Sequence, residues 1–186
     1  SQLEGRVDLS PVRDLGVQDG GRKKPLDTFA REKVALILGT KTYEGQDPLY
    51  TLFSLLFETD RWESVPALAV KYQRLVKLLG KKDPTKVENT AVISVAELNA
   101  SEAFDKEYRA IDPEDRMLGP YQEAILELNY RRLHFYKLAS MLCVAPIPGE
   151  RDGAKWSSIA NLDGQSAEVK KSVGERFQAA ALAWRS

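Results

Sequence analysis

The chain has 186 residues, 43% hydrophobic and 29% charged, and its 27 basic residues are balanced by 27 acidic ones. Length and composition are typical of a globular domain with a sizeable apolar core. A nucleic-acid-binding protein normally carries a basic excess, because its affinity comes largely from neutralising phosphates, so the charge balance disfavours that class.

No apolar stretch of the sequence approaches the roughly 18–20 residues needed to span a bilayer. We therefore expect one soluble domain over residues 1–186. The segment 145–165 is rich in Pro and Gly and lacks a clear periodicity. It is the best candidate for a boundary to a C-terminal lobe or extension over residues 145–186.

The N-terminal segment is predicted to form a β-hairpin. Val12 to Val17 has the character of a strand, and Arg22 to Pro25 of a second extended piece. Between them, Asp19-Gly20-Gly21 supplies the adjacent glycines that a tight hairpin turn requires.

Two apolar helices are predicted to follow the hairpin. Asp27 is expected to cap a helix that runs to about Leu38 and ends at Gly39. Asp47-Pro48 opens the next helix, because proline at the first helical position loses no hydrogen bond. Residues 49–57 are apolar nearly all round, which predicts a core helix.

Shorter elements are predicted in the middle of the chain. Ala67 to Val70 is a short strand that feeds a helix from Lys71 to Leu79, closed by Gly80. Ala91 to Ile93 is extended, and Ser94-Val95-Ala96-Glu97 fits a capping box at a helix start.

The longest helix is predicted from about Pro120 to Leu142, and a last helix from about Ser166 to Trp184. The first carries a stripe at alternating spacings of four and three, and the second carries its apolar residues on one face. The stripes are Tyr121, Ile125, Leu128, Arg132, Phe135, Ala139 and Leu142 in the first, and Val169, Val173, Phe177, Ala181 and Trp184 in the second. Together these elements predict an α+β fold that is mainly helical, with about six helices and a small N-terminal hairpin or sheet.

Side chains for catalysis and metal binding are sparse. His134 is the only histidine and Cys143 the only cysteine, so the chain contains no histidine pair for a metal and no internal disulfide. We expect His134 to be a packed or half-exposed structural residue and Cys143 a buried thiol. The chain is therefore predicted to be no enzyme, with no catalytic residue and no metal site.

A basic cluster beside the predicted turn has two interpretations. Arg22, Lys23, Lys24 and Arg31 are either solvated charges around a hairpin and a helix start, or a site for a carboxylate or anionic head group. Arginine forks match carboxylates, which favours the second interpretation. Arg22, Lys24 and Arg31 are the candidate ligand-binding residues.

The segment 17–31, with the sequence VQDGGRKKPLDTFAR, resembles a motif of one protein family. This family is the system II cytochrome c assembly proteins, whose run is close to dGR-x-kPLdT-x-AR. The residues that fall on this run are Gly21, Arg22, Lys24, Pro25, Leu26, Asp27, Thr28, Ala30 and Arg31. Later pieces follow in the family's order: Gly39 with Asp47-Pro48, Trp62 after the apolar helix, and Leu142 to Pro146 followed by Trp156-Ser157-Ser158.

The resemblance implies a fragment of a larger integral membrane protein, lying on the extracytoplasmic (periplasmic) side of a bacterial cytoplasmic membrane. In that family the membrane-embedded portion handles haem and exports or attaches it to apocytochromes. Haem is therefore expected to be handled by the full-length protein, with no cofactor in this domain. The expected partners are the membrane-embedded remainder of the same protein or complex and, as a second candidate, an apocytochrome c, but no nucleic acid.

The function implied is an interaction or scaffold module of cytochrome c biogenesis. A rival from another class is an extracytoplasmic domain that binds a small anionic ligand through Arg22, Lys24 and Arg31. A second rival is a hydrolase that uses only carboxylates, which needs no histidine.

The isolated domain is expected not to bind haem tightly. Haem iron normally takes histidine, methionine or a thiolate as axial ligand, and the candidates here are His134, Met117, Met141 and Cys143. His134 and Met141 lie about two turns and roughly 10 Å apart on the predicted helix, so they do not clamp one iron. Titration of haem into the parent and His134→Ala domains should give weak, matching curves, whereas a sharp Soret shift lost in the variant contradicts this expectation.

Overall fold

The computed structural model describes residues 8–81, 90–112, 117–141, 143–144 and 157–158, with five further positions between 167 and 175. These residues form an α+β structure that is mainly helical, which confirms the predicted fold class. The described part holds eight helices: five of the predicted six, and three short ones that the sequence analysis missed (α1, α4 and α7). The sixth predicted helix, 166–184, lies mostly outside the described residues. No described helix has the length and apolar character needed to cross a membrane.

The chain divides into two compact units. Residues 1–34, 41–57 and 137–186 belong to the first, and residues 35–40 and 58–136 to the second. The single domain expected for 1–186, with a C-terminal lobe over 145–186, stays a prediction. Most of 145–186 lies outside the described residues, including the apolar stripe of the predicted helix 166–184.

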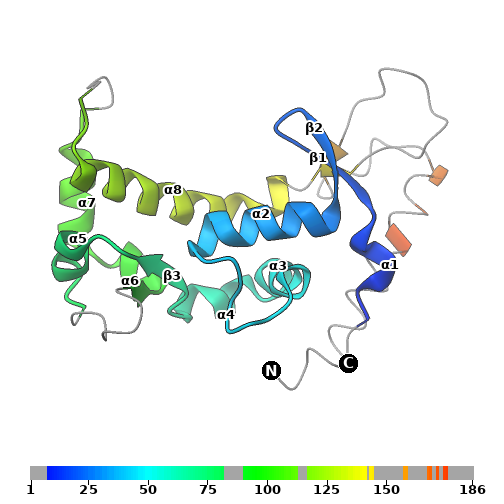
Figure 1. The fold of residues 1–186 in the computed structure, drawn as a ribbon, viewed down its shortest axis with the longest axis horizontal. Helices are drawn as coiled ribbons and strands as arrows, with labels where there is room; N and C mark the ends of the chain where they lie inside the picture. The colour runs from blue at the N-terminus through cyan, green and yellow to red at the C-terminus, as the bar shows by residue number, and fades with distance from the viewer. Residues whose placement is uncertain are drawn as a thin grey trace. The chain divides into compact units, whose positions relative to one another are not determined.

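The N-terminal hairpin of the first unit is formed as predicted and leads directly into a helix (Figure 1). Asp19 lies opposite Arg22, and Gly20 and Gly21 between them have φ angles of +57° and +77°. These left-handed angles suit a two-residue turn that matches the twist of the strands. The elements in order are α1 (Ser10–Arg13), β1 (Gly16–Asp19), β2 (Arg22–Pro25) and α2 (Leu26–Leu38).

The predicted strand from Val12 to Val17 is wrong over its first part. Ser10–Arg13 forms α1, with Pro11 in its first turn, and β1 begins only at Gly16. Proline has the φ angle of a helix start and no amide hydrogen for a strand ladder. Val12 is nevertheless buried, at 1% exposure.

Two short strands from late in the sequence extend this hairpin into a sheet. β5 (Cys143–Val144) pairs antiparallel with β1, and β6 (Ser157–Ser158) pairs antiparallel with β5. The strand order is β2-β1-β5-β6, with Val17 opposite Val144 and Cys143 opposite Ser158. The side chain of Cys143 lies outside the described part of the chain, so its predicted burial stays a prediction.

Helices α2 and α3 (Pro48–Phe57) supply most of the first unit's apolar core. Residues Pro48 to Leu55 of α3 are all buried, which confirms the predicted core helix. Asp47 opens it as predicted, since its Oδ1 accepts a hydrogen bond from the Leu49 amide at 2.8 Å. The buried residues of α2 in this unit recur at helical spacing: Leu26, Phe29, Ala30, Lys33 and Val34.

Asp27 does not take the predicted N-cap position. α2 begins at Leu26, so Asp27 lies inside the first turn. Because β2 runs straight into α2, the residue before the helix is Pro25, whose side chain has no acceptor. Asp27 instead accepts hydrogen bonds from Arg13 and Arg31 through its two carboxylate oxygens.

Among the described residues, the second unit holds a two-stranded sheet and four helices, together with most of α8. β3 and β4 pair antiparallel, with Leu68 opposite Ile93. The strands and helices predicted at 67–70, 71–79, 91–93 and 120–142 are confirmed to within two residues. The elements are α4 (Thr59–Ser64), β3 (Leu68–Val70), α5 (Gln73–Leu78), β4 (Ala91–Ile93), α6 (Val95–Asn99), α7 (Glu102–Arg109) and α8 (Pro120–Met141).

Side-chain caps define the starts of α6 and α7. Ser94 and Glu97 form the predicted capping box, with the Glu97 amide donating to Ser94 Oγ at 3.1 Å and the Ser94 amide to Glu97 Oε2 at 2.9 Å. Ser101 caps α7 by accepting from the Phe104 amide at 3.2 Å. The sequence analysis missed α7, although Phe104 and Tyr108 stand four positions apart and their rings stack on one face of the helix.

Three apolar residues of the stripe predicted along α8 are buried, Tyr121 is half-buried, and the side chains of Ala139 and Leu142 lie outside the described part of the chain. Ile125, Leu128 and Phe135 are each less than 5% exposed. Arg132 interrupts the stripe, and its guanidinium donates to Asn129 Oδ1 at 2.6 Å and pairs with Asp105 at 3.3 Å. The cation is therefore compensated within the unit.

Gly39 ends α2 as predicted, with a φ angle of +74°. It also makes room for a side chain of α8, because a Cβ at this position would lie 2.6 Å from Arg131 Cζ. Arg131 Nη1 donates to the Ala69 carbonyl at 2.6 Å, and Nη2 pairs with Glu127. Arg131 thereby links α8 to β3.

Gly39→Ala should lower the free energy of unfolding by about 2–5 kcal/mol, measured by urea denaturation. The left-handed backbone costs a non-glycine residue about 1–2 kcal/mol, and displacing Arg131 from Ala69 removes a hydrogen bond and leaves a carbonyl unpaired, for about 1–3 kcal/mol more. Gly80→Ala is the matched control: its φ angle is +65°, and nothing lies within 4 Å of a Cβ there. Equal losses in the two variants contradict the displacement of Arg131.

Candidate functional site

Lys24, predicted to bind an anion, is already held by two carboxylates of its own unit. Its Nζ lies 2.5 Å from Glu32 Oε2 and 3.1 Å from Asp19 Oδ2. Its side chain is only 14% exposed. The hydrogen bond to Glu32, with that to Asp19, raises the pKa of Lys24 above its ordinary value despite partial burial. Lys24 is therefore a cation whose charge is balanced from within.

Lys33, on the buried side of α2, pairs with Asp19, the same carboxylate that binds Lys24. Its Nζ lies 2.9 Å from Asp19 Oδ1 and 5.2 Å from the centre of the Phe29 ring, and its side chain is 8% exposed. Burial alone raises the pKa of Asp19, but the hydrogen bonds from Lys33 and Lys24 outweigh it and hold that pKa below its ordinary value. Two lysines and two carboxylates thus form a balanced cluster, named here the hairpin cluster: Asp19, Lys24, Glu32 and Lys33.

Arg31, the second predicted ligand, belongs to a neighbouring set of charges. Its Nε donates to Asp27 Oδ2 at 2.8 Å, while the side chain remains 62% exposed. The other oxygen of Asp27 accepts from Arg13, whose Nη2 also donates to Asp47 Oδ2 at 2.5 Å. Arg13 therefore joins α1 to α2 and to the start of α3. These four residues form the arginine cluster: Arg13, Asp27, Arg31 and Asp47.

Arg22, the third predicted ligand, is exposed at the hairpin turn, and it is the one of the three without an ion pair among the described residues. Lys24 and Arg31 belong to two different clusters, and each is paired with at least one carboxylate. An incoming anion has to compete with those carboxylates. The role of Arg22, Lys24 and Arg31 in binding a ligand stays a prediction.

Most residues of the two clusters were missed from the sequence. Arg13 and Asp47 are 34 positions apart, and no local pattern predicts their contact. Lys33 did carry a signal, because it stands on the spacing of Leu26, Phe29 and Ala30. Burying the charge of a lysine costs free energy unless an anion pairs with it. A lysine on the buried face of a helix therefore predicts a carboxylate nearby.

Metal-binding groups are absent from the described residues, where no three His, Cys, Asp or Glu side chains gather in suitable positions. His134 is half-exposed on α8, as predicted. Its Nδ1 lies 2.8 Å from the Tyr130 carbonyl oxygen, and its ring centre lies 3.7 Å from that of Tyr130. These contacts are those of a packed structural histidine.

Comparison with protein-family models and with curated protein sequences gives no match for this chain. The resemblance of segment 17–31 to the system II cytochrome c assembly proteins therefore stays a prediction.

The arginine cluster predicts how the protein responds to acid. Burial acts to raise the pKa of Asp47, but hydrogen bonds from Arg13 and the Leu49 amide outweigh it, so that pKa lies below its ordinary value. A depressed carboxyl pKa adds stability that is complete above about pH 4 and is lost as the pH falls through the folded-state pKa. Asp47→Asn should therefore flatten the loss of stability between about pH 4 and pH 2, measured by urea unfolding at each pH.

Comparing Asp47→Ala with Asp47→Asn separates the contribution of the helix cap at Leu49 from that of the ion pair with Arg13. Asparagine keeps an oxygen that accepts from the Leu49 amide, whereas alanine keeps neither interaction. At neutral pH the alanine variant should be less stable than the asparagine variant by about 1 kcal/mol, the usual contribution of an N-cap. An asparagine variant with the acid response of the parent argues against a role for the Arg13–Asp47 pair.

Proposed function

We propose that this chain is an extracytoplasmic interaction or scaffold module of a membrane-bound system II cytochrome c assembly protein. Its partners are then the membrane-embedded remainder of that protein or complex and an apocytochrome c. Haem is handled by the full-length protein, and this module positions the polypeptides around it.

The spatial arrangement of the resembling segments carries the proposal. Segment 17–31 supplies β1, β2 and the start of α2. β5, from the later segment 142–146, lies beside β1, and β6, from segment 156–158, lies beside β5. Asp47 of the Asp-Pro pair is joined to Asp27 of the motif through Arg13. Several resembling pieces thus gather in one sheet and one ion cluster of the first unit, whereas Gly39 and Trp62 belong to the second.

The charge arrangement favours a scaffold over the rival anion-binding domain. Lys24 and Arg31 are engaged with Glu32, Asp19 and Asp27, and each of the two clusters contains two cations and two anions. A site built for an anion has cations in excess of its own carboxylates. The motif residues therefore fit a fixed surface better than an open anion site.

Deletion of the gene in its host tests the proposal. We expect covalently bound haem in c-type cytochromes to be lost, on haem-stained gels, while the apocytochrome polypeptides are still made. The full-length gene should restore it, and sequence flanking this segment should encode membrane spans and a tryptophan-rich segment. Normal haem attachment in the deletion strain overturns the proposal.

Charge reversal then tests the module itself in the full-length protein. Arg22→Glu changes the exposed turn of the motif and breaks no ion pair among the described residues. It should reduce haem attachment if this surface meets a partner. Lys77→Glu, an exposed site on α5, is the matched control and should behave like the parent. The amount of each protein in the membrane fraction separates lost contact from lost folding.

A further inference from the structure

Two pockets of the second unit differ in size. One, of about 230 Å³, lies between the segment Ala69–Leu75 and the first turns of α8. The other, of about 410 Å³, lies between α5, the end of α7 and the start of α8. Sites for small molecules typically measure roughly 300–1,000 Å³. The second pocket therefore has the size of a small-molecule site, and the first does not.

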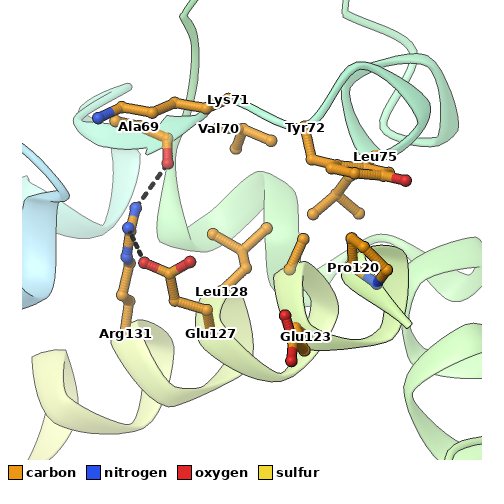
Figure 2. A pocket seen from close by; sticks show the side chains of 11 residues that line it. Ala69, Val70, Lys71, Tyr72, Leu75, Pro120, Glu123, Glu127, Leu128 and Arg131 are labelled. Carbon is orange, nitrogen blue, oxygen red and sulfur yellow. Dashed lines mark hydrogen bonds and ion pairs between the residues drawn. The ribbon is translucent and has the colours of Figure 1, made fainter. Parts of the chain in front are cut away.

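A link between β3 and α8 spans one end of the first pocket. There Arg131 donates to the Ala69 carbonyl at 2.6 Å and pairs with Glu127 (Figure 2). Tyr72 and Pro120 lie toward the opposite end, and both also line the second pocket. The link holds β3 against α8, so it also positions Tyr72, which follows β3 by two residues.

Two aromatic rings and an arginine line the second pocket side by side. The ring centres of Tyr72 and Tyr121 lie 5.9 Å apart, and Arg74 Cζ lies 3.9 Å from the centre of the Tyr121 ring. A guanidinium stacked on a ring is held in one plane, while its N–H groups point outward along that plane. Arg74 is exposed. Its fork is therefore both positioned and accessible to a carboxylate.

Glu107 lines the same pocket and meets the hydroxyl of Tyr121. This hydroxyl donates a hydrogen bond to Glu107 and accepts one from Arg74. Burial, and then the bond to Glu107, raise the pKa of Tyr121, so the hydroxyl stays protonated. Because both charged groups reach one hydroxyl, they lie within about 6 Å of each other, the length of two hydrogen bonds. Each keeps capacity for a ligand, since a carboxylate accepts about four hydrogen bonds and a guanidinium donates about five.

The rest of the second pocket is mostly apolar. Gln122 Oε1 accepts a hydrogen bond from the Gly119 amide at 2.7 Å, which fixes the chain at the start of α8. Four further lining residues supply carbon surface: Ala110, Ile111, Pro120 and Ile125. The pocket thus combines one cation and one anion with an apolar lining.

From these features we propose that the second pocket binds an α-amino acid with an apolar side chain. The carboxylate binds Arg74, the ammonium binds Glu107, and the side chain packs on the apolar lining. The ammonium nitrogen and the carboxylate carbon of an α-amino acid are about 2.5 Å apart, so one ligand spans the two protein charges. A pocket with one charge of each sign complements a ligand that itself carries both. This inference goes beyond the proposed function, since its test involves neither haem nor cytochromes.

Isothermal titration calorimetry on the intact chain tests the inference, with L-leucine and L-phenylalanine as probes. We expect saturable binding. N-acetyl-L-leucine lacks the ammonium, and L-leucinamide lacks the carboxylate. Each should bind at least about tenfold more weakly than L-leucine, because each loses a hydrogen bond to a charged group.

Three outcomes of this titration overturn the proposal. The first is no saturable binding of either amino acid. The second is equal binding of L-leucine and N-acetyl-L-leucine, which indicates a site for a carboxylate such as a peptide C-terminus. The third is equal binding of L-leucine and L-leucinamide, which indicates a site for an ammonium such as a peptide N-terminus.

Variants that remove one charge assign the two roles. Arg74→Gln should weaken binding of L-leucine at least about tenfold and remove its advantage over L-leucinamide. Glu107→Gln should remove its advantage over N-acetyl-L-leucine. Lys77→Gln on α5 and Glu102→Gln on α7 are the matched controls, exposed and outside the pocket lining, and should change affinity by less than about twofold. If both pocket variants discriminate among the three ligands as the parent does, the proposal is wrong.

Filling the pocket locates the binding without a change of charge. Ala110→Phe places a large side chain on an exposed lining position and should weaken binding of L-leucine at least about tenfold. Ala103→Phe, an exposed alanine on the same helix, is the matched control and should bind like the parent. Urea denaturation shows that both variants are folded. Equal affinity of the two folded variants overturns the proposal.

Discussion

The guanidinium of Arg13, held between Asp27 and Asp47, is the contact on which the first unit depends. Three segments meet at it: α1, the first turn of α2, and the residue that opens α3. An arginine suits this position because its planar fork donates in two directions at once and stays charged at any relevant pH. Each pair is partly exposed and worth little alone. The main contribution of the two pairs is to position α1 against the two core helices α2 and α3.

Local signals in the sequence predicted the local structure well. Asp19-Gly20-Gly21 gave the hairpin turn, Ser94 and Glu97 the capping box, and Asp47-Pro48 the start of α3. Each of these patterns satisfies its own backbone within four residues, so distant chain segments cannot change the outcome. The error over residues 12–15 has the same origin: the apolar Val12 was given more weight than Pro11, which directs the backbone locally.

Most of the ion pairs in the two clusters could not be predicted from the sequence. Arg22, Lys24 and Arg31 were interpreted as a basic cluster because they are close in the sequence. The spacing of four between Asp27 and Arg31 on one helix does predict the pair that they form. In the folded chain Asp19 faces Lys24 across the hairpin, and Glu32 and Lys33 reach it from α2. Pairing across a hairpin and onto the next helix depends on register and helix phase together. The pocket between β3 and α8, too, is lined by residues about 50 positions apart, and no sequence motif predicts it.

The order of strands in the sheet has a consequence for synthesis on the ribosome. β1 pairs with β2 at once, but its other edge is completed only by Cys143 and Val144. At about 5–20 residues per second, that edge stays open for roughly 6–25 s after β1 emerges. An open strand edge is a template for pairing with other nascent chains. β2, with the charged run Arg22-Lys23-Lys24, lies on the other side of β1, one strand away from this edge. A second chain that pairs edge to edge with β1 would bring two such hairpins together, and like charges such as that of the exposed Arg22 oppose this approach.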